Sequence, residues 1–213
     1  FGGILARRDK QSDAEQLVQY EIPEIDLVIV DLYPFEATVE AGADEATIIE
    51  KIDIGGISLI RAAAKNYKDV VILGSQAQYQ PFLELINLNG AKTTIEERRW
   101  FAKEAFAVSS HYDSAIFNYF DDENQSAFRC SEDGVKILRY GENPHQRGYY
   151  FGKFSEMFEQ LHGKEISYNN LLDIDAAVNL INDFEDITFA VLKHNNACGL
   201  ASRSFLKDAW EAA

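Results

Sequence analysis

The residues with the clearest chemical potential are Lys193 and His194, which follow an apolar run that begins at Phe189. The run is short and apolar, which is typical of a buried strand. Lysine offers a fixed positive charge, and histidine can take up or release a proton near neutral pH. Ligands of open α/β sheets bind beyond the strand ends, so this pair could contact a ligand. The alternative is a strand that simply ends in a polar turn, and short motifs of this kind more often reflect that.

A second candidate group consists of Tyr33, Asp53 and Lys65, with Gly55 and Gly56 just after the aspartate. Backbone amides at a helix start favour an anion, and glycines let a ligand approach the backbone. An aspartate, a lysine and a phenol in one pocket could bind a polar heterocycle and move protons. The same residues could be structural, with an acid at a helix start, a solvated lysine and a tyrosine that closes a turn. Spacing alone favours that structural interpretation.

Two further polar loops carry candidate binding residues. Arg139 could hold a phosphate through two parallel hydrogen bonds, with Tyr140 beside it. The alternative for this loop is a polar hairpin with an exposed arginine. Asn170 is either a turn former or an amide that orients a ligand, and the local sequence favours a turn. Asp173 is expected to cap a helix over residues 173–184.

Elements that alternate between strand and helix must position the first candidates. Apolar strands are predicted at 25–32 and 70–73, with helices between and after them. This alternation predicts an α/β fold with a parallel sheet over residues 1–120. Thr94 and Glu97 form a capping-box pattern that opens a long helix, in which His111 is expected to be a core residue. The candidate core positions of that helix are Trp100, Phe101, Ala105, Phe106, Val108, Tyr112, Ile116 and Phe120.

A polar, acid-rich segment at 121–134 predicts a domain boundary. The predicted organisation is a first domain at 1–125, a linker at 126–133 and a second domain at 134–213. Short strands are expected near 136–139 and 148–151, and Ser202 or Ser204 could cap a last helix. The chain begins without Met and its last helix has no stop signal, so we expect an internal piece of a longer protein.

Composition narrows the classes of function. The chain has 213 residues, 46% hydrophobic residues and a net charge of −15, so a packed core is expected. Such an acidic chain is a poor general ligand for nucleic acid or anionic membranes. No apolar run approaches the roughly 20 residues of a membrane helix. Cys130 and Cys198 have no partner at metal-ligand spacing, so no metal is expected.

Six segments in order resemble the bifunctional AICAR transformylase/IMP cyclohydrolase family of purine synthesis: FGGILARR, DLVIVDLYPFE, IEKIDIGGISLIRAAAKN, LRYGENPHQ, ISYNNLLDIDAA and VLKHNNACG. The resemblance implies a Rossmann-like parallel-sheet cyclohydrolase domain, followed by the start of a cytidine-deaminase-like transformylase domain. It implies AICAR and formyl-AICAR as substrates and 10-formyltetrahydrofolate as co-substrate, with no metal. It further implies a cytoplasmic homodimer without nucleic-acid or membrane partners.

The resemblance also implies roles for the candidate residues. His194 would be the general base on the attacking amine, and Lys193 would stabilise the developing oxyanion. Arg139, Tyr140 and Asn170 would contact AICAR. In the cyclohydrolase domain, the catalytic residues would be Tyr33, Asp53 and Lys65, with Gly55 and Gly56 beside the substrate.

Departures from the family pattern accompany the resemblance. Asp31 stands where asparagine is more frequent, Ala197 replaces a usual proline, and Phe1 replaces a frequent histidine. The family's Thr-Leu-His-Pro segment with its lysine, just upstream of Gly2 and Gly3, is missing, and most of the transformylase domain would lie beyond Ala213. Each site therefore lacks essential groups, and this chain alone is expected to catalyse neither reaction at a useful rate. One alternative is a non-catalytic nucleotide-binding or assembly module of the same fold. Another is a zinc deaminase, which would need more ligands than Cys198 supplies.

Overall fold

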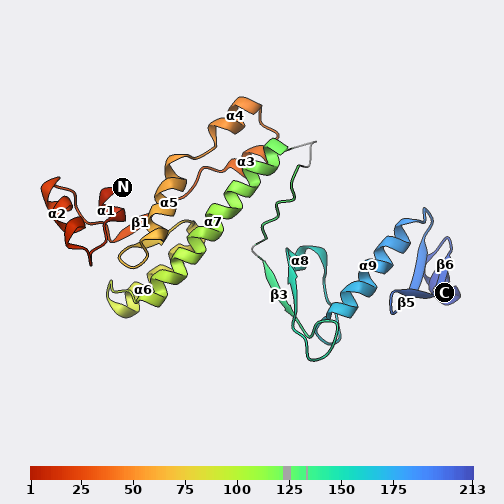
Figure 1. The fold of residues 1–213 in the computed structure, drawn as a ribbon. Helices are drawn as coiled ribbons and strands as arrows, with labels where there is room; N and C mark the ends of the chain where they lie inside the picture. Colours follow the sequence, from red (N-terminus) through yellow and green to blue (C-terminus); the bar gives the residue numbers. More distant parts are fainter. Residues whose placement is uncertain (122–125, 133) are drawn as a thin grey trace. The chain divides into compact units, whose positions relative to one another are not determined.

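The computed structural model describes residues 1–121, 126–132 and 134–213, so residues 122–125 and 133 of the predicted boundary segment lie outside the described residues. The chain forms two compact units, Phe1–Ser131 and Glu132–Ala213. Figure 1 shows their elements in chain order. Within the described residues, no helix combines the length and apolar character needed to span a bilayer.

The first unit contains a small parallel sheet made of β1 (Leu27–Ile29) and β2 (Val71–Leu73). Only three residues of the predicted first strand are paired, so that strand is shorter than expected. The helices of this unit are α1 (Gly2–Leu5), α2 (Gln11–Gln19), α3 (Phe35–Glu40), α4 (Glu45–Glu50), α5 (Gly55–Lys65), the 3₁₀ turn η1 (Gln76–Gln78), α6 (Tyr79–Asn89) and α7 (Ile95–Asp121). Residues of β1, β2, α5 and α7 share one buried apolar cluster. The combination of helices with a parallel strand pair agrees with the predicted α/β class.

Helix α7 begins with the predicted capping box. Thr94 N donates to Glu97 Oε2 at 2.6 Å, and Glu97 N donates to Thr94 Oγ1 at 3.2 Å. The predicted core positions Phe101, Ala105 and Tyr112 are buried. Three others are wrong, because the side chains of Trp100, Phe106 and Phe120 are exposed. Neighbouring helical residues point about 100° apart, and with Phe101 and Ala105 turned to the core, the large side chains of Trp100 and Phe106 fall at the edge of the buried face.

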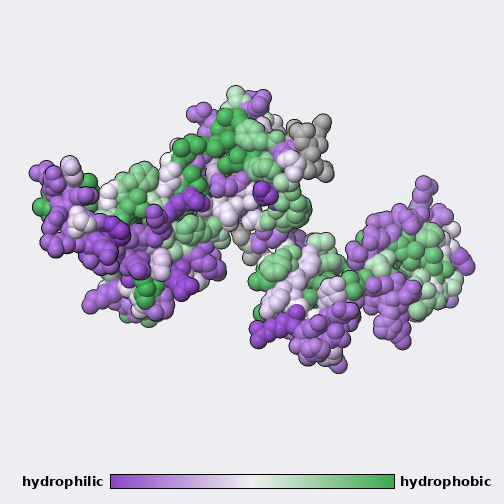
Figure 2. Space-filling model, in the orientation of Figure 1, coloured by the Kyte–Doolittle hydropathy of each residue, from purple (hydrophilic) through white to green (hydrophobic). Residues whose placement is uncertain are grey.

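The described residues of the second unit, 132 and 134–213, form two antiparallel strand pairs and three helices. Its elements are β3 (Val135–Leu138), β4 (Gly148–Phe151), α8 (Phe154–Met157), α9 (Tyr168–Asn182), β5 (Thr188–Lys193), β6 (Asn196–Ser202) and α10 (Leu206–Ala212). β3 pairs with β4, and β5 pairs with β6. The strands near 136–139 and 148–151 are therefore confirmed, whereas β6 was not foreseen. Hydrophobic side chains form part of the exposed surface of both units (Figure 2).

Two predicted helix caps are wrong. Helix α9 begins at Tyr168 because Ser167 caps it: Ser167 N donates to Asn170 Oδ1 at 3.1 Å, and Asn170 N donates to Ser167 Oγ at 3.4 Å. This reciprocal pair satisfies amides that Asp173, six residues after Ser167, cannot reach. Helix α10 has Phe205 at its N-cap position without a side-chain hydrogen bond. Ser202 lies in β6 instead, where its hydroxyl pairs with Thr188 Oγ1 at 2.7 Å.

Candidate functional site

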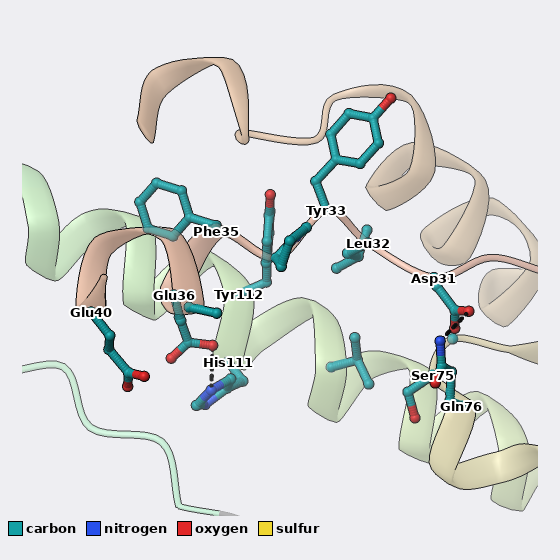
Figure 3. Close-up of a pocket in the computed structure, with 14 residues that line it drawn as sticks. Asp31, Leu32, Tyr33, Phe35, Glu36, Glu40, Ser75, Gln76, His111 and Tyr112 are labelled. Carbon is teal, nitrogen blue, oxygen red and sulfur yellow. Dashed lines mark hydrogen bonds and ion pairs between the residues drawn. The ribbon is translucent and has the colours of Figure 1, made fainter. Parts of the chain in front are cut away.

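The first unit holds a cavity of about 550 Å³ at the carboxyl ends of β1 and β2. The segments that follow these strands, residues 31–34 and 74–76, form part of its wall, and α3 and α7 supply the rest. Figure 3 shows these residues around the cavity. Ligands of open parallel sheets bind at this edge, because the strand-end loops leave a crevice there. The cavity is therefore the candidate site of the first unit.

Asp31 lines one end of the cavity, and its carboxylate accepts hydrogen bonds from two neighbouring side chains. Tyr79 Oη donates to Asp31 Oδ2 at 2.7 Å, and Gln76 Nε2 donates to the same oxygen at 3.2 Å. The hydrogen bond to Asp31 raises the pKa of the Tyr79 phenol above its ordinary value. A carboxylate suits this position because it accepts from two donors at once.

His111 is not a core residue, contrary to the prediction. It lines the cavity, and its Nε2 lies 3.0 Å from Glu36 Oε2 (Figure 3). The other ring nitrogen, Nδ1, is buried and has no hydrogen-bond partner within the described residues. The sequence contains no signal for this pair, because 75 positions separate Glu36 from His111.

Tyr33 lies on the cavity wall, and the residue is 57% exposed. The ring points away from Glu36 (Figure 3) and toward Lys51, whose Nζ lies 5.7 Å from the ring centroid. A lysine ammonium at this distance interacts with the face of the Tyr33 ring, and its positive charge would stabilise an anionic group placed beside it. Lys51 is a cation near Tyr33 that the sequence patterns did not single out.

Asp53 is buried at the start of α5. Its Oδ1 accepts from Gly56 N at 2.6 Å, so the carboxylate satisfies one of the free amides in the first turn of the helix. Its own backbone N donates to Tyr112 Oη at 2.7 Å, and that hydroxyl donates to Lys51 O at 2.8 Å. A side chain at position 56 would meet the carboxylate, since a Cβ there would lie 2.6 Å from Asp53 Oδ2. A Cβ added at Gly55 would instead lie in open space, with no heavy atom within 4 Å.

Lys65 lies at the opposite end of α5 from Asp53. With a rise of 1.5 Å per residue, the axial distance from Gly55 to Lys65 is about 15 Å. The lysine is exposed at the last turn, where a cation complements the helix dipole. The structure thus brings Tyr33 and Asp53 close to Lys51, but it does not bring Lys65 to them.

Arg139 and Tyr140 contact each other directly in the second unit. Arg139 Nη2 donates to Tyr140 Oη at 2.9 Å, and the guanidinium lies 4.7 Å from the ring centroid. Hydrogen bonds from Ser167 and Arg139 lower the pKa of the Tyr140 phenol below its ordinary value. Tyr168 N donates to Tyr140 O at 3.1 Å, which fastens this loop to the start of α9.

Lys193 and His194 lie at an exposed hairpin turn. Lys193 pairs with Asn196, so His194 and Asn195 form a two-residue loop with φ values of 52° and 61°. Positive φ at both positions is typical of a type I′ turn, whose twist matches the strands. Asn195 N donates to Asp173 Oδ1 at 2.8 Å, so the turn lies beside α9. The strand does end in a polar turn, and that turn presents the ionisable pair to solvent.

The opening turns of α9 connect the predicted site residues of the second unit. Asn170 belongs to the cap of this helix, the Tyr140 loop bonds to its first residue, and the His194 turn bonds to its second turn. In the part of the chain that the structure describes, no group of three His, Cys, Asp or Glu residues could hold a metal ion. Cys130 and Cys198 are exposed free thiols.

Comparison with known proteins gives consistent matches. The AICARFT/IMPCHase bienzyme family matches residues 63–213. The bifunctional purine biosynthesis protein PurH of Bacteroides thetaiotaomicron is 71% identical over 213 residues, which are 100% of this chain and 42% of the relative. PurH of Rippkaea orientalis is 42% identical over 227 residues, covering 100% of this chain and 44% of that protein. The chain thus spans less than half the length of these relatives. A solved structure, the crystal structure of ForH, is 35% identical, with a TM-score of 0.48 over 56% of this chain and 61% of that one.

Proposed function

The chain belongs to the AICARFT/IMPCHase bienzyme family, and from this premise we propose that it serves the last two steps of purine nucleotide synthesis. In the first step, the 5-amino group of AICAR attacks the formyl carbon of 10-formyltetrahydrofolate. The bond from that carbon to the folate nitrogen breaks, which gives formyl-AICAR and tetrahydrofolate. In the second step, formyl-AICAR closes to IMP with loss of water. The printed name of the PurH relatives, bifunctional purine biosynthesis protein, supports this proposal.

We assign the cyclohydrolase to residues 1–125 as a Rossmann-like domain and the start of the transformylase to residues 134–213 as a cytidine-deaminase-like domain, joined by a linker at 126–133. The parallel pairing of β1 with β2 supports the first assignment. The division of the chain into two compact units supports the presence of two domains.

The observation that carries the transformylase proposal is the convergence of its residues on α9. The loop of Arg139 and Tyr140 and the turn of His194 each bond to the opening turns of that helix. Arg139 would bind the AICAR phosphate and Tyr140 its ribose, with Asn170 nearby. His194 would take the proton from the attacking amine, and Lys193 would stabilise negative charge on the formyl oxygen.

For the cyclohydrolase we propose catalytic roles for Tyr33, Asp53 and Lys65, with the amides of Gly55 and Gly56 near the substrate. The cavity beside Tyr33 at the strand ends supports a ligand site in this unit. Asp53 and Lys65 lie at opposite ends of α5, so Lys65 is the member of this set with the weakest geometric support.

The proposed chemistry requires no resident metal, since an amine attack and a dehydration can proceed with protein acids and bases. The partners that we propose are AICAR, formyl-AICAR and 10-formyltetrahydrofolate, together with a second copy of the protein. A cytoplasmic location is part of the same proposal, as is the lack of nucleic-acid or membrane partners.

A chimeric enzyme tests the proposal with the residues of this chain. The matching segment of the Bacteroides thetaiotaomicron relative is replaced by these 213 residues, and both reactions are assayed separately. We expect both activities. His194→Ala should reduce formyl transfer by several orders of magnitude and leave cyclisation largely intact, because the two reactions use different sites. Lys65→Ala should do the reverse.

Two outcomes would contradict the assignment. If each substitution lowered both activities together, the division into two sites would be wrong. If the chimera bound AICAR and IMP by calorimetry but catalysed neither formyl transfer nor cyclisation, the non-catalytic module would be favoured. The 213-residue chain by itself is expected to give neither reaction at a useful rate, because it spans only 42% of the PurH relative and each proposed site would be incomplete.

A further inference from the structure

Asp173 makes a hydrogen bond to the His194 turn, although it has no place among the binding and catalytic roles proposed for the second unit. It lies in the second turn of α9, and its Oδ1 accepts a hydrogen bond from the backbone N–H of Asn195 at 2.8 Å. In the described part of the chain, this is the one side-chain hydrogen bond between α9 and the β5–β6 hairpin. The aspartate therefore ties the turn that carries His194 to a helix 22 positions away in sequence.

The turn needs such a tie because of its backbone conformation. His194 and Asn195 both have positive φ, a region that side chains disfavour and glycine tolerates. Two-residue hairpin loops of this type usually carry Asn-Gly. Within the turn, Asn196 Nδ2 donates to His194 O at 2.7 Å. A left-handed turn without glycine persists when surrounding contacts hold it, and Asp173 supplies one from outside the hairpin.

The same helix holds the other half of the candidate site. Its first residue, Tyr168, donates from its backbone N to Tyr140 O at 3.1 Å, and Arg139 bonds to the Tyr140 hydroxyl. We propose that Asp173 is a positioning residue whose carboxylate fixes the His194 turn against α9 and so sets where His194 stands relative to Arg139. This inference rests on the transformylase function proposed above.

Hydrogen exchange in the 213-residue chain tests the contact itself. Asp173→Ala removes the acceptor, while Asp173→Asn keeps an amide oxygen at the same place. Asp175→Ala is the matched control, because Asp175 lies on the same helix and its carboxylate accepts only from Asn179 Nδ2, at 3.3 Å, among the described residues. By NMR, the Asn195 amide should exchange at least about tenfold faster in Asp173→Ala, which corresponds to about 1.4 kcal/mol. The Asp173→Asn and Asp175→Ala chains should exchange as the unchanged chain does.

Turnover in the chimera tests the positioning role. Asp173→Ala should lower kcat for formyl transfer about tenfold or more and leave KM for AICAR within about twofold, because the Arg139 contact remains. Asp173→Asn should restore kcat. Asn195→Gly added to Asp173→Ala should restore part of it, since glycine adopts positive φ without a partner. Cyclisation by the same variants should be unchanged.

Several results would overturn the inference. These are unchanged Asn195 exchange in Asp173→Ala, an equal loss in Asp175→Ala, or no recovery in Asp173→Asn. Loss of the folded second unit in Asp173→Ala, seen by circular dichroism, would make the residue structural and would equally reject the positioning role. Alanine is a good helix former, so folding is expected. A chimera that turns over nothing rejects the proposed function, while Asn195 exchange still decides whether Asp173 holds the turn.

Discussion

Replacing Tyr112 by phenylalanine should destabilise the first unit through a single atom. The Tyr112 hydroxyl accepts from Asp53 N at 2.7 Å and donates to Lys51 O at 2.8 Å, and the residue is buried. Phenylalanine keeps the ring, so no large cavity forms and the Asp53 amide is left without an acceptor. An unpaired buried donor costs about 1–3 kcal/mol, so we expect a loss of about 2 kcal/mol in the free energy of unfolding.

The two tryptophans of the chain allow this loss to be measured in the first unit alone. Trp100 lies in the first unit and Trp210 in the second. In a Trp210→Phe background, urea unfolding followed by tryptophan fluorescence therefore reports on Trp100. With a slope of about 2 kcal/mol per molar urea, the midpoint should fall by about 1 M in Tyr112→Phe.

Tyr119→Phe is the matched control, because Tyr119 lies on the same helix and also packs edge-on against Phe35. Its hydroxyl makes no side-chain hydrogen bond within the described residues. The midpoint of this control should move little. If Tyr112→Phe lost no more stability than Tyr119→Phe, the dependence of Asp53 on the Tyr112 hydroxyl would be refuted.

The pH dependence of folding stability provides a second test of the Tyr112 hydroxyl. Burial is the main cause that raises the pKa of its phenol in the folded state. The unfolded chain therefore loses this proton first, at a pH of about 10. The contribution of Tyr112 to stability is complete below that pH and declines as the pH rises above it. Tyr112→Phe should lack this alkaline component when the urea midpoint is measured against pH.

Two further predictions concern Asp53 in the first unit and Tyr140 in the second. Gly56→Ala should lower the free energy of unfolding, measured by urea, by about 1 kcal/mol or more, because its Cβ would meet the carboxylate of Asp53. Gly55→Ala, whose Cβ would lie in open space, should be neutral or slightly stabilising. In phenolate absorbance titrations, the difference between the unchanged chain and Tyr140→Phe should show a group that ionises below pH about 10. Arg139→Gln should move that titration upward, and an unmoved curve would contradict the pKa argument.

Local sequence patterns predicted the elements whose determinants are close together in the chain. The Thr94–Glu97 pair opens α7 because both partners of the capping box lie within one turn. The strand at 148–151 appears with the predicted bounds, since its apolar residues follow one another directly. The start of α9 was missed although its signal is equally local. Ser167 and Asn170 form a capping box with an asparagine in place of the usual Glu or Gln.

The second hairpin strand was missed for a different reason. The loop between β5 and β6 lacks the Asn-Gly or Asp-Gly pair that marks a type I′ turn, because His194 occupies its first position. Contacts outside the hairpin stabilise this turn, so no window of neighbouring residues contains the information. His194, the unusual residue at the first turn position, is also the residue proposed as the general base. Departures from local preference are expected at positions that serve function.

The candidate sites depend mostly on contacts between distant residues. Glu36 meets His111 across 75 positions, and Asp53 meets Tyr112 across 59. Such pairs form when packed elements bring them together, so hydrophobic periodicity can predict the helix but not which of its polar residues meets a partner. His111 shows this limit, because its apolar neighbours predict burial while α3 supplies a carboxylate at its exposed edge. Long-range pairing of this kind makes the cavity beside Tyr33 a property of the folded unit, and substitutions on α7 should therefore alter it as readily as substitutions beside Tyr33 itself.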